Sequence, residues 1–269
     1  KEVTQGACNI FLGFDAGRCN LTGSSNVYIG QHTGKTVCCG FFDVAMGFQT
    51  LCESKYACNN VAIGKNVFPK LNCGGQNNFA MFNIGMGGFV GTALTTGRYN
   101  LLMGYNTALC MTTGCTNIIL GCRTAKMMTG GTDNIFIGKY AGKSDVVGSA
   151  GDNNIAIGNL AGLGVSATSD RNVFIGQGAG RYASSGCFNV AIGDHAGSYV
   201  TGNRNVFLGQ YAGFVHCVTG SCNVAIGDAV CLPSASGSKQ LAIGAGATNW
   251  ISGDSDFNVT ISGIATAYA

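Results

Sequence analysis

A short apolar phrase recurs along the chain and sets its pattern of hydrophobic and polar positions. An Asn, or a residue standing in for it, precedes three mostly apolar residues and a glycine, as in residues 189–193 and 205–209. Most steps between phrases are 16 to 18 residues long. A fixed short period of this kind is the signature of a solenoid, whose repeats bury their apolar faces only against their neighbours. The phrase begins at Asn9, Asn26, Asp43, Asn60, Asn78, Asn100, Asn117, Asn134, Asn154, Asn172, Asn189, Asn205, Asn223, Gln240 and Asn258.

The apolar triplet of each phrase predicts a short β-strand, because it alternates with a period of two and is rich in β-branched residues. Its first and third members are expected to face the same way and to form the core. No segment carries a helical period over the length that a helix requires. The sequence therefore predicts an all-β fold: a parallel β-solenoid (β-roll or β-helix) of about fifteen repeats of 16–22 residues.

The middle position of the triplet alternates between large and small residues over the later repeats. It reads Phe136, Ala156, Phe174, Ala191, Phe207 and Ala225. With one repeat per coil, each Phe would lie between two Ala in the stack, as dense packing favours. With two repeats per coil, Phe would stack on Phe. We favour one short coil per repeat, and the alternative of two repeats per coil stays open.

The repeats leave no boundary where a second domain would begin, so we expect residues 1–269 to form one continuous solenoid domain. Regularity breaks around residues 67–98, where Pro69 and a 22-residue step indicate an irregular insertion. Neither end of the array resembles a cap. Solenoid ends expose unpaired strand edges, so this pattern favours end-to-end stacking or continuation into further modules.

The recurring Asn indicates a structural role, because stacked Asn side chains can form a ladder of hydrogen bonds from coil to coil. The residues expected to form this ladder are Asn9, Asn26, Asn60, Asn117, Asn134, Asn154, Asn172, Asn189, Asn205 and Asn223.

The composition narrows the classes of partner. Charged residues make up 10% of the chain, against roughly a quarter in ordinary globular proteins. The net charge of +3 is small and no run of Lys or Arg occurs, so we expect no nucleic-acid partner. Glycine and polar residues interrupt every apolar run, which predicts no membrane insertion. A thin-cored solenoid with so few charges is expected to associate with itself.

Fourteen cysteines are present, and three pairs of them bracket comparable turns. Cys110 and Cys115 enclose one turn, and Cys217 and Cys222 enclose the same turn in a later repeat. Cys52 and Cys58 enclose a similar segment. We expect disulfides to close these loops, which would place the protein in an oxidising, extracellular compartment. The alternative is that cysteine acts as a small apolar filler.

Candidate chemistry is sparse. Cysteine spacings lack the paired knuckles of a zinc site, and only His32, His195 and His216 could join them. The acidic stretch at 254–256 lacks the Gly and Glu that a calcium loop requires. Most carboxylates fall in turns just before the motif Asn, where they suit turn formation. We predict no enzyme activity, no catalytic residue, no metal site and no cofactor.

The phrases at residues 60–64 and 189–197 resemble the head repeats of trimeric autotransporter adhesins. They also look like the Gly-rich repeats of bacteriophage tail and virion fibres, particularly those of marine phages. The resemblance to the adhesin heads implies a left-handed parallel β-roll whose three chains associate side by side. It also implies an extracellular location, on a virion or a cell surface.

These observations predict a structural, non-enzymatic fibre protein, a rigid self-associating solenoid that forms the shaft of an extracellular fibre and supports attachment. Its partner would be itself, as a homotrimer or an end-to-end filament, together with a host cell-surface glycan or protein. One alternative is a glycan-binding module that uses the exposed aromatic residues Tyr182, Tyr199, Tyr211 and Trp250. A remote alternative is an ice-binding solenoid, for which a regular Thr ladder is missing.

Overall fold

The fold is an all-β parallel β-solenoid with about thirteen turns and repeats of about 17 residues. The structure, a computed structural model, describes residues 6–71, 80–144, 147–148, 151–166, 168–214 and 218–263, and none of these residues lies in a helix. The chain divides into two compact units, Lys1–Ala150 and Gly151–Ala269. Each unit is described by itself below, and the single continuous domain stays a prediction.

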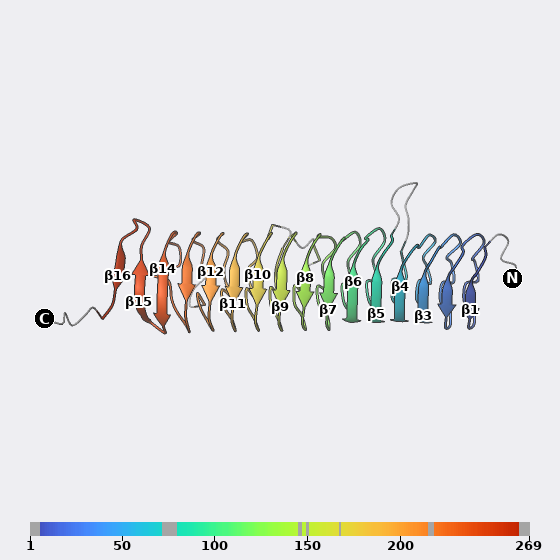
Figure 1. Ribbon diagram of the computed structural model, residues 1–269, viewed down its shortest axis with the longest axis horizontal. Coiled ribbons are helices and arrows are strands. Elements are labelled where there is room, and N and C mark those ends of the chain that lie inside the picture. Colours follow the sequence, from blue (N-terminus) through green and yellow to red (C-terminus); the bar gives the residue numbers. More distant parts are fainter. Residues whose placement is uncertain are drawn as a thin grey trace. The chain divides into compact units, whose positions relative to one another are not determined.

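The described residues of the first unit form eight strands, one in each coil, and every neighbouring pair is parallel and in register (Figure 1). Adjacent strands come from adjacent repeats, so Ile10 pairs with Val27 and Val27 with Val44. The strands are Ile10–Leu12 (β1), Val27–Ile29 (β2), Val44–Phe48 (β3), Val61–Lys65 (β4), Ile84–Gly88 (β5), Leu101–Tyr105 (β6), Ile118–Leu120 (β7) and Ile135–Ile137 (β8).

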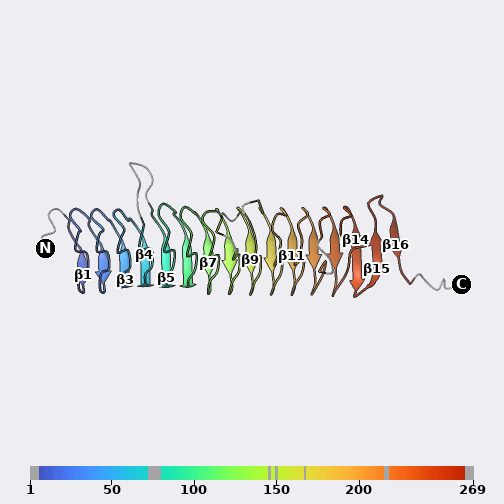
Figure 2. The same cartoon turned by 180° about the vertical axis from the view of Figure 1, so that it is seen from behind.

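The second unit repeats this arrangement and then departs from it. Six strands pair in parallel, but the last two pair in antiparallel fashion (Figure 2). The strands are Ile155–Ile157 (β9), Val173–Ile175 (β10), Val190–Ile192 (β11), Val206–Leu208 (β12), Val224–Ile226 (β13), Leu241–Ala245 (β14), Thr248–Gly253 (β15) and Val259–Ile261 (β16).

This antiparallel end corrects two sequence predictions. The phrase at Asn258 is not a coil, because it leads into β16, which pairs in antiparallel fashion with β15. Asn258 instead donates from its side-chain amide to Asp254, 2.9 Å away. The outer edge of β14 is likewise not open, because β15 occupies it over residues 241–245.

The interior of each coil receives the middle residue of the strand, not the first and third as the alternation had suggested. The middle residues Ala45, Phe136 and Phe207 are fully buried, whereas the residues on either side of them are partly exposed. A coil of about 17 residues encloses little space, and the strand contributes only one inward side chain to it. The expected core positions were therefore wrong, and the columns of first and third residues face outward.

The alternation of Phe and Ala confirms one repeat per coil. Phe174 pairs with Ala156 on one side and with Ala191 on the other, and Ala191 in turn pairs with Phe207. A ring thus lies between two methyl groups along the stack, which keeps the interior densely packed.

The glycine that ends each strand lies directly over the same glycine of the next coil. At Gly64, φ is +133°, and an added Cβ would collide with the carbonyl of Gly87. Such a conformation suits only glycine. The close approach of two backbones therefore explains why this position tolerates no side chain.

The motif Asn side chains form a ladder of buried hydrogen bonds inside each unit. Asn117 illustrates it: its Nδ2 donates to Asn100 Oδ1 (3.0 Å) and to the Gly131 carbonyl (2.9 Å). Its Oδ1 accepts the backbone N–H of Asn134 at 3.0 Å. Each rung ties one coil to the previous coil, to the following coil and to its own closing turn. This satisfies polar groups that would otherwise destabilise the interior.

The irregular segment is narrower than predicted. The ladder continues from Asn60 to Asn83, 23 residues later, and then to Asn100, 17 residues later. The repeat therefore begins at Asn83 and not at Asn78, which lies outside the described residues. Because β5 and the residues up to 98 follow the regular pattern, residues 80–98 do not belong to an irregular insertion, and residues 72–79 lie outside the described residues.

Candidate functional site

The outward side of the strands is the first candidate surface, and in the first unit the first and third residues of each strand are all apolar. The first and third residues of every strand from β1 to β8 point away from the interior. They are Ile10, Leu12, Val27, Ile29, Val44, Met46, Val61, Ile63, Ile84, Met86, Leu101, Met103, Ile118, Leu120, Ile135 and Ile137. Strands spaced about 4.8 Å apart extend these two columns over roughly 35 Å. Contiguous exposed apolar surface of this kind marks an interaction site.

The second unit carries the same two columns over its parallel strands. They consist of Ile155, Ile157, Val173, Ile175, Val190, Ile192, Val206, Leu208, Val224, Ile226, Leu241 and Ile243. Ile192 has an exposed fraction of 40%. We call these columns the outer apolar face of each unit.

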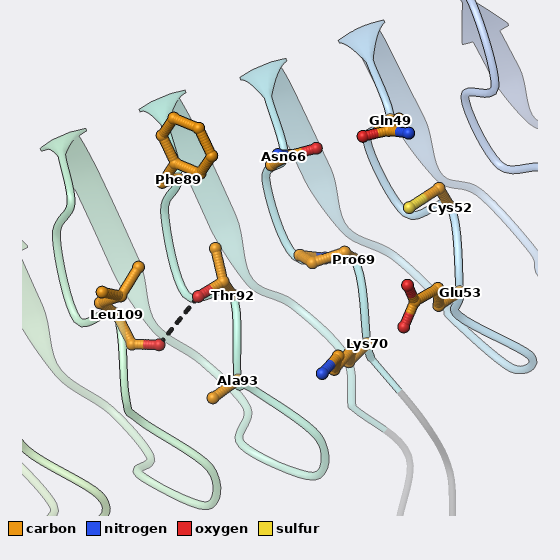
Figure 3. Close-up of a pocket in the computed structure, with 10 residues that line it drawn as sticks. All are labelled: Gln49, Cys52, Glu53, Asn66, Pro69, Lys70, Phe89, Thr92, Ala93 and Leu109. Atoms are coloured by element: carbon orange, nitrogen blue, oxygen red, sulfur yellow. Dashed lines mark hydrogen bonds between the residues drawn. The ribbon is translucent and has the colours of Figure 1, made fainter.

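A groove on the turn side of the first unit is the second candidate site. It has a volume of about 380 Å³ and is lined by residues from four successive coils. Figure 3 shows one row formed by Gln49, Asn66 and Phe89, facing a second row that includes Glu53 and Lys70.

The backbone explains why the first row projects into the groove. Gln49, Asn66 and Phe89 occupy the same place in their coils, two residues after the end glycine, with φ values of 54°, 51° and 55°. This left-handed conformation turns the chain sharply there. The N–H of each residue donates to the preceding coil, for example from Asn66 to the Phe48 carbonyl at 2.9 Å. The backbone is thus fixed while the side chain remains outside.

The corresponding place in the second unit holds a cluster of aromatic rings. Tyr182 and Tyr199 stack with ring centroids 4.9 Å apart, and Phe214 lies 5.8 Å from Tyr199. Tyr211 packs against Phe214 at 5.1 Å and stacks on His195 at 5.3 Å. Three of the four aromatic residues considered for glycan binding are therefore clustered, although their sequence spacing did not indicate this. The fourth, Trp250, lies apart in β15.

Asp43 occupies a rung of the interior ladder and is fully buried. Its Oδ1 accepts from the Asn60 backbone N–H at 2.9 Å and from Asn60 Nδ2 at 3.1 Å. In other rungs, the side-chain Nδ2 donates to the preceding Asn and to the carbonyl of the closing turn. Asp43 has Oδ2 in that place, and the corresponding residues there are Asn26 and Ala57. Among the described residues, neither Asp43 Oδ2 nor the Tyr28 hydroxyl has a hydrogen-bond partner within bonding distance.

This geometry calls for a protonated carboxyl group at Asp43. A carboxylate would set Oδ2 against carbonyl oxygens, whereas a carboxylic acid would donate there as an amide does. Burial raises the pKa of Asp43 to about 7, and the hydrogen bonds from Asn60 and the interaction with the Tyr28 hydroxyl oppose this shift only in part. Burial also raises the pKa of Tyr28, and the nearby Asp43 adds to that shift. Asp43 is therefore a proton-dependent rung.

The predicted disulfides are not formed. Cys52, Cys110 and Cys115 are free thiols, so neither the Cys52–Cys58 nor the Cys110–Cys115 bridge exists. Cys222 is also a free thiol, and its expected partner, Cys217, lies outside the described residues.

The coil geometry explains why these thiols do not meet. Each turn bonds to the next coil instead of folding back on itself: the Cys110 N–H donates to Lys126 and the Cys115 N–H to Gly131. Cys52 lines the groove, whereas Cys58 lines a separate apolar depression of about 410 Å³ with Phe41. Cys52 and Cys58 therefore sit on different parts of the coil surface.

Within the described ranges, no group of three or more His, Cys, Asp or Glu side chains is arranged to hold a metal ion. His32 lies 3.5 Å from Asp15, and His195 hydrogen-bonds Asp194 at 2.7 Å, while His216 is not among the described residues. A search of the same part of the chain finds no helix with the length and hydropathy to cross a membrane.

The sequence reasoning did not identify the groove residues. Gln49, Asn66 and Phe89 differ in chemistry, and only their shared offset from the end glycine could have placed them on one row. Comparison with known proteins finds no matching family model, curated protein or solved structure.

Proposed function

We propose that this protein is a structural, non-enzymatic fibre protein that associates with copies of itself through the outer apolar face. The observation that carries the proposal is the uninterrupted run of Val, Ile, Leu and Met at the first and third positions of every parallel strand. Exposure of this apolar surface to water is unfavourable. Burying it between two paired faces stabilises the assembly by about 25 cal/mol per Å² of apolar area.

Two further observations support a mechanical role. Backbone hydrogen bonds and Asn side chains link each coil to the next within a unit, so bending breaks many bonds together. The arrangement also favours side-by-side association over end-to-end stacking at β14, because β15 already occupies that strand edge. A trimer with three outer faces turned inward is one arrangement that fits these observations.

The extracellular location, on a virion or a cell surface, rests on the resemblance of the repeats to fibre and adhesin heads. The free thiols remove the disulfide argument for it. A role in supporting attachment to a host glycan or protein rests on the same resemblance.

The test is the mass of the protein in solution. The chain has a mass of 27.5 kDa, and sedimentation equilibrium at micromolar concentration should give a multiple of it. The double variant Ile192→Lys and Ile226→Lys places two charges on the outer apolar face and should shift the mass toward the monomer. The matched control is Tyr182→Lys, since Tyr182 is about as exposed, at 39%, but lies on the turn side.

The control should keep the mass of the wild-type assembly. A wild-type protein that stays monomeric over the whole concentration range would exclude the proposal. So would an assembly that the double variant leaves intact while its circular dichroism remains that of the wild type.

A further inference from the structure

The groove of the first unit has one polar end and one apolar end. Gln49, Asn66, Glu53 and Lys70 supply amide, carboxylate and ammonium groups at one end. Phe89 and Leu109 supply apolar surface at the other, while Pro69 lies between Asn66 and Lys70 (Figure 3). A ligand that fits must therefore be amphipathic over a short distance.

The hydroxyl of the lining residue Thr92 is used by the protein itself, since it donates to the Leu109 carbonyl at 3.0 Å, but four other polar side chains of the groove are not. Within the described residues, the side chains of Gln49, Asn66, Glu53 and Lys70 make no hydrogen bond or ion pair. An amide both donates and accepts, a carboxylate accepts and an ammonium donates. Together they match an array of hydroxyl groups, each of which is both donor and acceptor. The charges of Glu53 and Lys70 cancel, so the lining gives no preference for a charged ligand.

The apolar wall is held in place. Lys65 Nζ lies 5.4 Å from the centroid of the Phe89 ring, and Tyr105 packs against that ring with centroids 6.0 Å apart. The rest of the ring borders the groove. An aromatic surface beside hydrogen-bonding groups suits a pyranose, whose ring carries C–H groups on one face and hydroxyls around its edge.

We propose that this groove binds a neutral carbohydrate, with the C–H face of a sugar against Phe89 and its hydroxyls on Gln49, Asn66 and Glu53. The volume of about 380 Å³ lies within the range of small-ligand sites. This site is separate from the outer apolar face and does not depend on the proposed fibre function.

Peptides and nucleic acids fit the groove less well. An extended peptide binds by adding to an open strand edge, but backbone groups here already bond to the next coil, as from Glu53 to the Pro69 carbonyl at 2.8 Å. A nucleic acid needs several cations along its backbone, and Lys70 is the lone cationic residue among those lining the groove.

The test is binding of the full chain to an array of neutral oligosaccharides built from glucose, galactose or N-acetylglucosamine, with sialylated and sulfated oligosaccharides alongside. Any neutral oligosaccharide that binds is then titrated by calorimetry. Asn66→Gly removes an amide at a positive φ that glycine adopts freely, and Phe89→Leu removes the aromatic ring. Each should weaken binding about tenfold.

The matched control is Asn106→Gly. Asn106 occupies the same place one coil beyond Phe89, with φ of 53°, but does not line the groove, so its variant should bind like the wild type. The proposal fails if no neutral oligosaccharide binds, if only acidic ones bind, or if Asn66→Gly and Phe89→Leu bind as the control does. Sedimentation of the same variants should give the wild-type mass, which separates this outcome from a failure of the fibre proposal.

Discussion

The turn sides of the two units share one backbone plan and carry opposite surfaces. In the first unit, Gln49 and Asn66 face short or polar residues across the coil, and a groove remains open. In the second unit, Tyr199 and Phe214 occupy the places that Glu53 and Cys52 hold in their coil, and stacked rings cover the surface. The coil fixes where side chains project, and residue size then decides whether a groove exists.

The interiors differ in a related way. In the second unit the aromatic ring that fills the coil comes from the strand, as at Phe174. Gly180, which has no side chain, leaves room for this ring. In part of the first unit the ring comes from the turn: Phe68 fills the space beside Gly85 and Gly91. In both places an aromatic ring fills the interior beside a glycine, but the strand supplies the ring in one case and the turn in the other.

The largest expected effect concerns the glycine column that both units share. Gly104→Ala in the first unit and Gly193→Ala in the second would each drive a Cβ into the glycine carbonyl of the next coil. Each should destabilise its unit by about 3 kcal/mol or more, measured by urea denaturation. Gly246→Ala is the control, because its φ is +59° but nothing lies within 4 Å of the added Cβ. Equal losses at Gly104 and Gly246 would show that backbone contact is not the cause.

The next largest loss of stability is expected when an aromatic ring is removed from the interior. Phe68→Ala and Phe174→Ala should each cost about 3–5 kcal/mol, because both remove a fully buried ring from a narrow core. Phe257→Ala, at a residue that is 79% exposed, should change stability by less than about 0.5 kcal/mol. If Phe68→Ala proved as mild as Phe257→Ala, the turn would not substitute for the strand as a source of core volume.

The ladder gives a pH-dependent prediction for the first unit. The pKa of Asp43 is about 7 in the folded protein and about 3.9 in an unfolded chain. Between these values the folded state binds the extra proton, so stability falls as pH rises from about 4 to 7 and then levels off. The slope should be at most about 1.4 kcal/mol per pH unit.

Asp43→Asn should remove this slope and raise the stability at pH 8 by roughly 1–3 kcal/mol, because an amide restores the missing donor. Melting temperatures at pH 5, 6, 7 and 8 measure both effects. Asn60→Asp is the reciprocal variant and should introduce a slope of the same sign. A wild-type melting temperature that rises from pH 5 to 7, with no change in Asp43→Asn, would contradict a protonated rung.

The smallest effect concerns the aromatic cluster of the second unit. Tyr199→Ala removes contacts with two rings and should cost about 1–2 kcal/mol, whereas Tyr182→Ala removes one ring contact and should cost about half as much. Thermal unfolding followed by near-ultraviolet circular dichroism reports both the stability and the tyrosine environment. Equal losses in the two variants would argue against pairwise stacking as the source of the stabilisation.

Much of the fold follows from local pattern. The period of the Asn phrase predicted a parallel solenoid, and the alternation of Phe174 with Ala191 predicted one repeat per coil; both are present in the structure. The recurrence of Asn also indicated a ladder, and hydrogen bonds link these side chains. These features are readable because each depends on the residue type at one fixed place in the repeat.

The candidate sites could not be predicted from the sequence in the same way. Alternation showed that residues 173 and 175 share a face, but it could not say which face is inside, and the first and third residues of the strand were assigned to the core. Because the narrow coil encloses little space, only the middle residue of the strand faces inward. The cysteines failed for a related reason: Cys110 and Cys115 are near in sequence, but their backbone is bound to the neighbouring coil.

By itself, the sequence determined the repeat, the strand within it and the glycine and Asn columns, because these positions obey local backbone geometry and hydrogen bonding. The tertiary structure alone decided which strand residues face outward, that the ladder resumes at Asn83, and that Asn66, Phe89 and Glu53 border one groove. Those facts depend on how much space a closed coil encloses and on which residues successive coils bring side by side.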